Sequence, residues 1–491
     1  MAFDDAHGRW KNLDKDLKRI GSVEYAARSG WQPIVAPATA LAFIALAALV
    51  VGLFVDLGAT PITVVVAAAL GAYMALNIGA NDVANNMGPA VGARVLTMGG
   101  ALVLAALCES AGALLAGGDV VGTISKGIVD PTGMPPQEFV WAMMAALVAS
   151  AAWVNLATVL GAPVSTTHAV VGGVMGAGIA AAGLSAVDWP TMGAIAASWV
   201  ISPVLGGANA AFILAFVEWR IIKRADIIGA ARVWVPVLIG VMAGVFGAYM
   251  ALKGLRHIVR LDIAMAALIG TVVGLLAYGA SVPFIRRRSA GLENRKRSLK
   301  ALFGLPLIIS AALLSFAHGA NDVANAVGPL AAIVYANEVG GVALSVAIPL
   351  WVMVIGAFGI SLGLFLFGPR LIRMVGDQIT KLNPVRAYCV ALSAAITVIV
   401  ASWLGLPVSS THIAVGGVFG VGFFREWDES RRMRAGLVMA ARKDYGVEER
   451  RRRKLVRRSH FMTIVAAWVV TVPAAALLSA MVFLAISAIA G

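Results

Sequence analysis

Charged side chains are scarce in this sequence. Asp, Glu, Lys and Arg make up 13% of the 491 residues, whereas 60% are hydrophobic and the mean hydropathy is +0.87. A water-soluble protein of this length needs far more polar side chains to cover its surface. The composition therefore excludes an ordinary soluble protein and indicates a chain whose apolar surface faces lipid.

Cysteine is also rare, and Cys108 and Cys389 lie far apart in apolar runs. They form neither a metal-binding spacing nor a disulfide framework. The sequence has no phosphate-binding loop, no metal-ligand cluster and no Ser/His/Asp set outside a duplicated motif described below. We therefore predict no cofactor and no enzymatic activity, and an ATP-driven pump would need a separate nucleotide-binding subunit.

The net charge of +14 is concentrated in short polar stretches, which does not favour nucleic-acid binding. Basic residues gather at 11–28, 220–232, 286–300, 370–386 and 425–458. Such clusters are typical of cytoplasmic segments. We predict a cytoplasmic tail over 1–33 and a basic cytoplasmic loop over 425–460, either a helical hairpin or partly disordered. From its charge, that loop could alternatively dock a regulator or anionic lipid.

Apolar runs long enough to approach or cross a bilayer of about 30 Å recur along the chain. They lie at about 36–56, 62–80, 98–117, 137–160, 163–184, 190–217, 233–252, 262–284, 301–318, 341–367, 384–404, 407–424 and 461–489. With the N-terminal tail inside, strict alternation places the four most basic breaks inside as well. Lys253, Arg256 and Arg260 fit less well, because alternation places them outside.

Two motifs each occur twice. Residues 79–89 (GANDVANNMGP) are echoed by 319–329 (GANDVANAVGP), and 163–168 (PVSTTH) by 407–412 (PVSSTH), with offsets of 240 and 244 residues. Matches in the same order at nearly the same spacing indicate a tandem duplication. Seven apolar runs separate the two copies, and this odd number inverts the second copy relative to the first. Inverted repeats with matching Gly- and Pro-broken polar segments are typical of transporters whose site lies between the repeats.

The first motif places a carboxylate among amide side chains. Asn81 and Asn85 share a helical face with Asp82 beside them, and Asn321, Asp322 and Asn325 repeat the pattern. A carboxylate within a bilayer costs at least ~2.5 kcal/mol and persists where it binds a cation, takes a proton or lines a wet cavity. We predict that Asp82 and Asp322 bind a sodium ion or a proton.

The second motif follows a helix break and supplies hydroxyl groups at a new helix start. The hydroxyl residues are Ser165, Thr166, Thr167, Ser409, Ser410 and Thr411. They and the free backbone N–H groups suit an oxyanion, although N-capping also explains them in part. His168 and His412 are equally consistent with donors or packing residues. We interpret His318 as structural, because its counterpart in the other copy is Ile78.

An oxyanion and two aspartates can share such a site only when cations or protons accompany the anion. An inside-negative potential also opposes the entry of an anion by ~2.3 kcal/mol per charge per 100 mV. The sequence therefore predicts cation–anion symport. Phosphate is favoured because it retains protons that it can donate to a carboxylate. Sulfate transport by the same fold remains an alternative, and an anion channel is less favoured because the polar residues concentrate in the two motif pairs.

At these residues the chain resembles the inorganic phosphate transporter (PiT) family, from about Ile62 to the C-terminus. Further similarity appears in Glu109-Ser110-Ala111-Gly112 and over residues 122–128 (GTISKGI). The resemblance implies an all-α polytopic membrane protein with two inverted-topology repeats, about 12 core transmembrane segments, homodimers, and phosphate symport with sodium or protons. Some bacterial sulfate permeases also resemble this family.

The resemblance also implies roles for individual residues. The Asn and Asp side chains named above would line the substrate and cation sites, the six hydroxyl residues would hold phosphate, and Glu109 would take part in cation coupling. Animal members carry a functional glutamate in both halves. The matching stretch here, residues 388–393, contains no acid, which leaves the number and identity of the cations open.

We expect the following organisation in a bacterial inner membrane, with lipid around a multi-pass chain. An added N-terminal transmembrane helix at 34–57 precedes repeat 1 at 58–232. Linking helices and a basic loop follow at 233–300, and repeat 2 occupies 301–491.

Overall fold

The computed structural model describes residues 34–55, 61–131, 134–160, 164–254, 261–339, 348–378, 382–434 and 458–490. Within these ranges the chain is helical, with one isolated β-bridge between Val129 and Val187 and no β-strand. The predicted tail over 1–33 and most of the 425–460 loop lie outside the described residues.

The helices are Ile34–Phe54 at the N-terminus, α2 (Pro61–Gly92), α3 (Met98–Ala116), α4 (Gly118–Lys126), α5 (Pro136–Leu160), α6 (Thr166–Ala182), α7 (Trp189–Val217), α8 (Ile227–Tyr249), α9 (Ile263–Ser289), α10 (Leu299–Leu302), α11 (Gly304–Asp322), α12 (Ala324–Val339), α13 (Leu350–Gln378), α14 (Pro384–Trp403), α15 (Ser410–Arg434) and α17 (Arg458–Ala490). Short π-helical turns, Glu218–Ile222 and Met250–Gly254, extend α7 and α8.

Eleven helices in the described residues are long and apolar enough to cross a membrane, and α6 is a shorter apolar helix. Each of the thirteen apolar runs overlaps a helix, so the prediction of an all-α polytopic membrane protein is confirmed. Many large apolar side chains are exposed, such as Leu268, Leu275 and Leu276 on α9. A membrane-spanning protein presents such side chains to lipid. The number of crossings stays a prediction.

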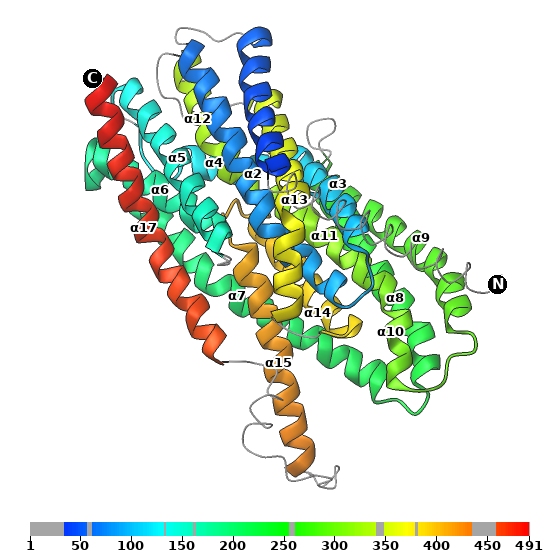
Figure 1. Ribbon diagram of the computed structural model, residues 1–491. Helices are drawn as coiled ribbons and strands as arrows, with labels where there is room; N and C mark the ends of the chain where they lie inside the picture. The colour runs from blue at the N-terminus through cyan, green and yellow to red at the C-terminus, as the bar shows by residue number, and fades with distance from the viewer. Residues whose placement is uncertain are drawn as a thin grey trace, which may run out of the picture.

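Helices from the two halves of the chain pack against each other in matched pairs. α2 packs against α13, as α11 packs against α3. Likewise α6 packs against α17, as α15 packs against α7. In Figure 1, α15 lies beside α7 and α17 runs along one edge of the bundle. Each half therefore supplies its last long helix to the other half, which joins the two motif copies within one bundle.

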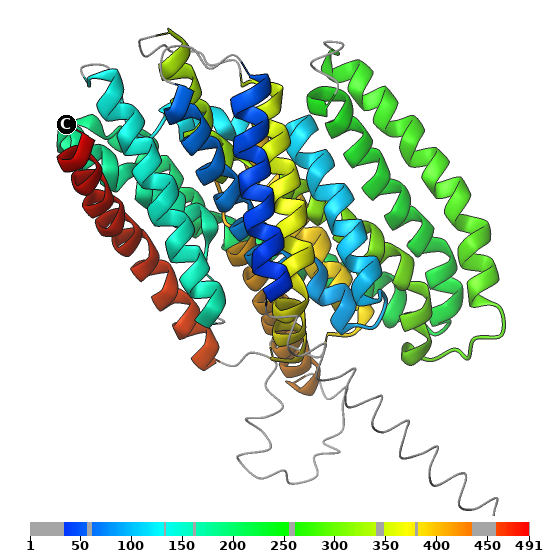
Figure 2. The same ribbon diagram turned by 45° about the horizontal axis from the view of Figure 1, so that its top comes forward.

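α8 and α9 form an antiparallel pair at the opposite side of the molecule from α17 (Figure 2). Gly240 and Gly244 of α8 face Gly270 and Gly274 of α9 closely enough that added side-chain atoms would contact the opposite backbone. Small residues at such spacing allow close helix packing in membranes. This pair corresponds to the predicted linking helices.

Three of the four basic breaks contact one another at one end of the bundle. Lys223 forms an ion pair with Asp428 at 2.8 Å, and Asn294 accepts a hydrogen bond from the backbone of Ile227 at 2.8 Å. This end is the lower end in Figure 1. These breaks therefore lie at one end of the bundle, and their cytoplasmic placement stays a prediction. Lys253, which alternation places at the other face, is paired with Asp119 at 2.6 Å.

Candidate functional site

Both Asn-Asp motifs are buried, but the helices that carry them differ at the aspartate. α2 continues through the first motif to Gly92, past the end of its apolar run, whereas α11 ends at Asp322 and α12 begins at Ala324. The motif therefore lies inside a helix in the first copy and at a break between two helices in the second. Asp82 and Asp322 are each only 1% exposed. Neither carboxylate faces lipid or bulk solvent.

The hydroxyl motifs begin helices α6 and α15 directly beside these aspartates. Ser165 caps α6 by accepting a hydrogen bond from the backbone N–H of His168, and Ser409 does the same for His412. These two serines therefore act as N-caps. The hydroxyls that follow them donate to the carboxylates or to the other motif copy.

Asp82 receives hydroxyl hydrogen bonds from both motif copies. Thr166 donates to its Oδ2 at 2.9 Å and Thr411 donates to its Oδ1 at 3.1 Å. Ser410 donates to Oδ2 of Asp322 at 3.5 Å. Hydrogen bonds to an ionised oxygen are stronger than neutral ones, so each bond stabilises the charged carboxylate.

The asparagines join the two copies across the centre of the molecule. Asn85 donates to Thr411 Oγ1 at 2.7 Å, and its counterpart Asn325 donates to Thr167 Oγ1 at 3.2 Å. On the outer side, Asn81 contacts Thr158 Oγ1 at 3.0 Å, as Asn321 contacts Ser402 Oγ at 2.9 Å. All twelve residues predicted from the motifs lie in one centre, and all except the half-buried Asn85 are buried.

His318, which the sequence analysis interprets as structural, lies at the middle of this centre in contact with its acids. Its Nε2 is 3.0 Å from Asp322 Oδ2 and 3.7 Å from Asp82 Oδ2, and its Nδ1 is 3.4 Å from Glu109 Oε1. We call Asp82, Glu109, His318 and Asp322 the carboxylate centre. Among the described residues, His318 is the basic side chain that lies within 4.0 Å of all three acids.

The signal for His318 was present in the sequence. It precedes Asp322 by four residues, so both side chains share one helical face. The comparison of the two motif copies nevertheless favoured a structural role for His318, because Ile78 occupies the corresponding position in the first copy.

Glu109 is also fully buried, and it enters the centre from α3. Asn86 donates to its Oε1 at 2.9 Å, and the imidazole of His318 lies on the same oxygen. This placement brings Glu109 to the predicted aspartates although it lies outside both motifs.

On the opposite side of the centre, apolar residues occupy the positions equivalent to these polar groups. A side-chain atom added to Gly319 would collide with the backbone carbonyl of Glu109, and one added to the matching Gly79 would collide with that of Ile360. Ile360 on α13 therefore occupies the position equivalent to Glu109 on α3. Asn86 is matched by Ala326, and His318 by Ile78. The expected match between Glu109 and residues 388–393 is therefore wrong. Those residues lie on α14, which packs as α5 does in the other half.

The carboxylate centre can hold a cation. One ligand atom from each of Asp82, His318 and Asp322 lies within 4.8 Å of the others. Carboxylate, amide and hydroxyl oxygens suit a hard cation. A neutral imidazole can contribute one nitrogen ligand, whereas a protonated one is a donor at both nitrogens and itself serves as the positive charge.

The sequence model of the "Phosphate transporter family" matches residues 78–479, a span that includes the carboxylate centre and both hydroxyl motifs. This chain belongs to that family. A Helicobacter pylori protein named "Putative phosphate permease" is 43% identical, and the match covers 96% of this chain and 98% of the relative. A Pyrococcus abyssi protein of the same description is 36% identical over 84% of this chain and 95% of its own length.

A solved structure titled "The sodium-dependent phosphate transporter" has the same fold. Its TM-score is 0.78 at 35% sequence identity, and the match covers 87% of this chain and all of that one. The resemblance to the inorganic phosphate transporter family is therefore confirmed, and the chain is a multi-pass protein of a phosphate-transporting family.

Proposed function

We propose that this protein carries inorganic phosphate inward by symport with cations. The observation that supports it best is that hydroxyls from two helix starts, one in each motif copy, donate to Asp82 and Asp322. Hydroxyls, amides and helix N-termini bind an oxyanion, whereas the acids repel it unless cations or protons are present.

The charge of the centre requires such companions. Three carboxylates face one imidazole, so even a protonated His318 offsets only one of three negative charges. Buried unpaired charges are strongly unfavourable. We infer that cations or protons bind together with phosphate and leave with it, because either charge alone would be costly in this place.

Sodium and protons are both compatible with the geometry. The solved relative is titled a sodium-dependent transporter, which favours sodium. His318 favours a contribution from protons, because imidazole titrates near neutral pH. We propose that Asp82 and Asp322 bind the coupled cations, that Glu109 holds His318, and that Thr166, Thr167, Ser410 and Thr411 hold phosphate.

Movement of the site between the two sides would follow from an inverted repeat of 58–232 and 301–491. The exchanged helix pairs support this reading, because each motif copy is held by helices of the other half. We further propose a homodimer in a bacterial inner membrane, with no cofactor and no enzymatic activity.

Uptake of labelled phosphate into proteoliposomes tests the proposal. We expect saturable accumulation that requires an inward sodium or proton gradient and that unlabelled phosphate inhibits far more strongly than sulfate. Strong inhibition by sulfate with weak self-inhibition by phosphate would identify a sulfate permease. Non-saturating flux that ignores both gradients would identify an anion channel.

A further inference from the structure

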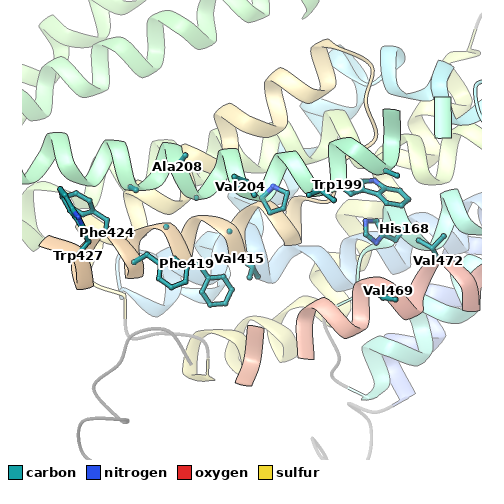
Figure 3. A pocket seen from close by; sticks show the side chains of 18 of the residues that line it. His168, Trp199, Val204, Ala208, Val415, Phe419, Phe424, Trp427, Val469 and Val472 are labelled. Carbon is teal, nitrogen blue, oxygen red and sulfur yellow. The ribbon is translucent and has the colours of Figure 1, made fainter. Parts of the chain in front are cut away.

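An apolar groove with a volume of about 1150 Å³ opens between α7, α15 and α17 (Figure 3). Its walls include Trp199 of α7, Phe419 and Phe423 of α15, and Val472 of α17. The groove ends at His168, whose ring lies 3.9 Å from that of Trp199. It exists because α17 packs against α6 and not closely against α15.

The lining of the groove continues along one face of α15 into positive charge. Phe419, Phe423 and Trp427 recur at four-residue spacing, and Arg431 and Arg434 continue the same face. Both arginines are exposed, and the guanidinium of Arg431 lies 5.4 Å from the centre of the Trp427 ring. Aromatic residues followed by basic ones are typical of the cytoplasmic boundary of a membrane protein.

One neighbouring cation at this end is already neutralised. Lys223 is paired with Glu218 at 3.1 Å and with Asp428 at 2.8 Å. Among the described residues, no ion pair within 4.0 Å neutralises Arg431 or Arg434. These two arginines therefore offer an anion-binding position at the mouth of an apolar groove.

The geometry points to a binding site for an anionic phospholipid, with one acyl chain in the groove and the headgroup phosphate against Arg431 and Arg434. Val415 to Trp427 spans about 18 Å along a helix, which matches one leaflet of about 15 Å. A second copy of this chain is a poorer occupant. A copy with the same orientation in the membrane would bring its own basic end to the same level.

The inner end of the groove adjoins the transport site. His168 directly follows Thr166 and Thr167, which bond to Asp82 and Asn325. His168 also lies 4.5 Å from the His412 ring of the other motif copy. An acyl chain that reaches His168 therefore contacts the start of α6 directly and lies one ring away from the start of α15, so lipid occupancy should influence uptake.

Native mass spectrometry of the full-length protein with equal amounts of phosphatidylglycerol and phosphatidylcholine tests the site. We expect the wild type to retain phosphatidylglycerol preferentially. Ala208→Trp, which fills the groove, and the double variant Arg431→Gln/Arg434→Gln should each retain at least fivefold less. Matched controls on the lipid-facing α9, Ala280→Trp and Arg287→Gln/Arg288→Gln, should retain it as the wild type does.

Uptake in vesicles of the two lipids gives a second readout. We expect phosphatidylglycerol to raise the rate of wild-type uptake by about threefold and the two groove variants to lose this response. Equal retention of both lipids by the wild type, or equal loss in the α9 controls, would overturn the proposal. So would a dimer that dissociates in Ala208→Trp while lipid retention is unchanged, because the groove would then hold a second copy.

Discussion

The two motif copies hold their aspartates in different surroundings. Asp82 receives hydroxyls from both copies, whereas Asp322 lies 3.0 Å from the imidazole of His318 and has a single longer hydroxyl contact. The outer asparagines make an equivalent contact in both copies, Asn81 with the Thr158 hydroxyl and Asn321 with the Ser402 hydroxyl. The copies therefore agree in the parts that suit an oxyanion and differ in the charged parts that surround it.

The difference lies in three polar side chains on one side of the centre, which we call the polar arm. Glu109, Asn86 and His318 form a polar chain on one side of the centre, and Ile360, Ala326 and Ile78 replace them on the other. A substrate held symmetrically needs the same hydroxyls from both copies. A titratable arm needs to occur only once. This one combines Glu109 and Asn86 of the first copy with His318 of the second, so the hydroxyls recur in both copies whereas the titratable groups lie on one side of the centre.

The largest effect is expected from the feature that both copies share. Asp82→Asn and Asp322→Asn should each lower coupled phosphate uptake by about two orders of magnitude. A hydrogen bond to a charged group contributes up to about 3 kcal/mol, and the amide also cannot neutralise a cation. Uptake in proteoliposomes with matched protein amounts measures the loss. Both variants should insert into the membrane in the same amount as the wild type. Wild-type uptake by either variant would remove that aspartate from the mechanism.

The motif duplication was enough to predict the centre but not its asymmetry. Asp82 and Asp322 were found because each supports the other as a repeated polar residue in an apolar segment. His318 was missed for the opposite reason, since one copy lacks it. The equivalence of Glu109 and Ile360 could not be read from the sequence, because it depends on which backbones meet at Gly319 and Gly79. The apolar groove between α7, α15 and α17 likewise could not be read from the sequence, because it depends on the packing of α17 against α6 of the other half.

The polar arm can be converted into its apolar counterpart. His318→Ile leaves Glu109 buried beside two aspartates without a positive neighbour, so it should destabilise the protein more than the double variant His318→Ile/Glu109→Ile. This non-additive pattern is expected for groups in direct contact. Thermal unfolding in detergent measures it, and Ile360→Val is the control in the apolar arm.

Uptake by the same double variant tests what the polar arm does. We expect about tenfold slower uptake and a weaker dependence on pH between 5.5 and 7.5, where imidazole ordinarily titrates, with dependence on sodium retained. An unchanged pH profile in a well-folded double variant would show that His318 takes no part in proton linkage. The two arms would then differ in packing alone.

The smallest effect is expected where the copies are alike. Asn85→Ala and Asn325→Ala each remove one hydrogen bond to a threonine of the opposite copy. A neutral hydrogen bond contributes about 1 kcal/mol, which corresponds to roughly fivefold in the apparent affinity for phosphate. Asn85 also lies 3.4 Å from Asp82 Oδ1, so its loss should be slightly the greater. Concentration dependence of uptake measures both values. A difference above tenfold between the two variants would mean that the asymmetry of the polar arm extends into the phosphate site itself.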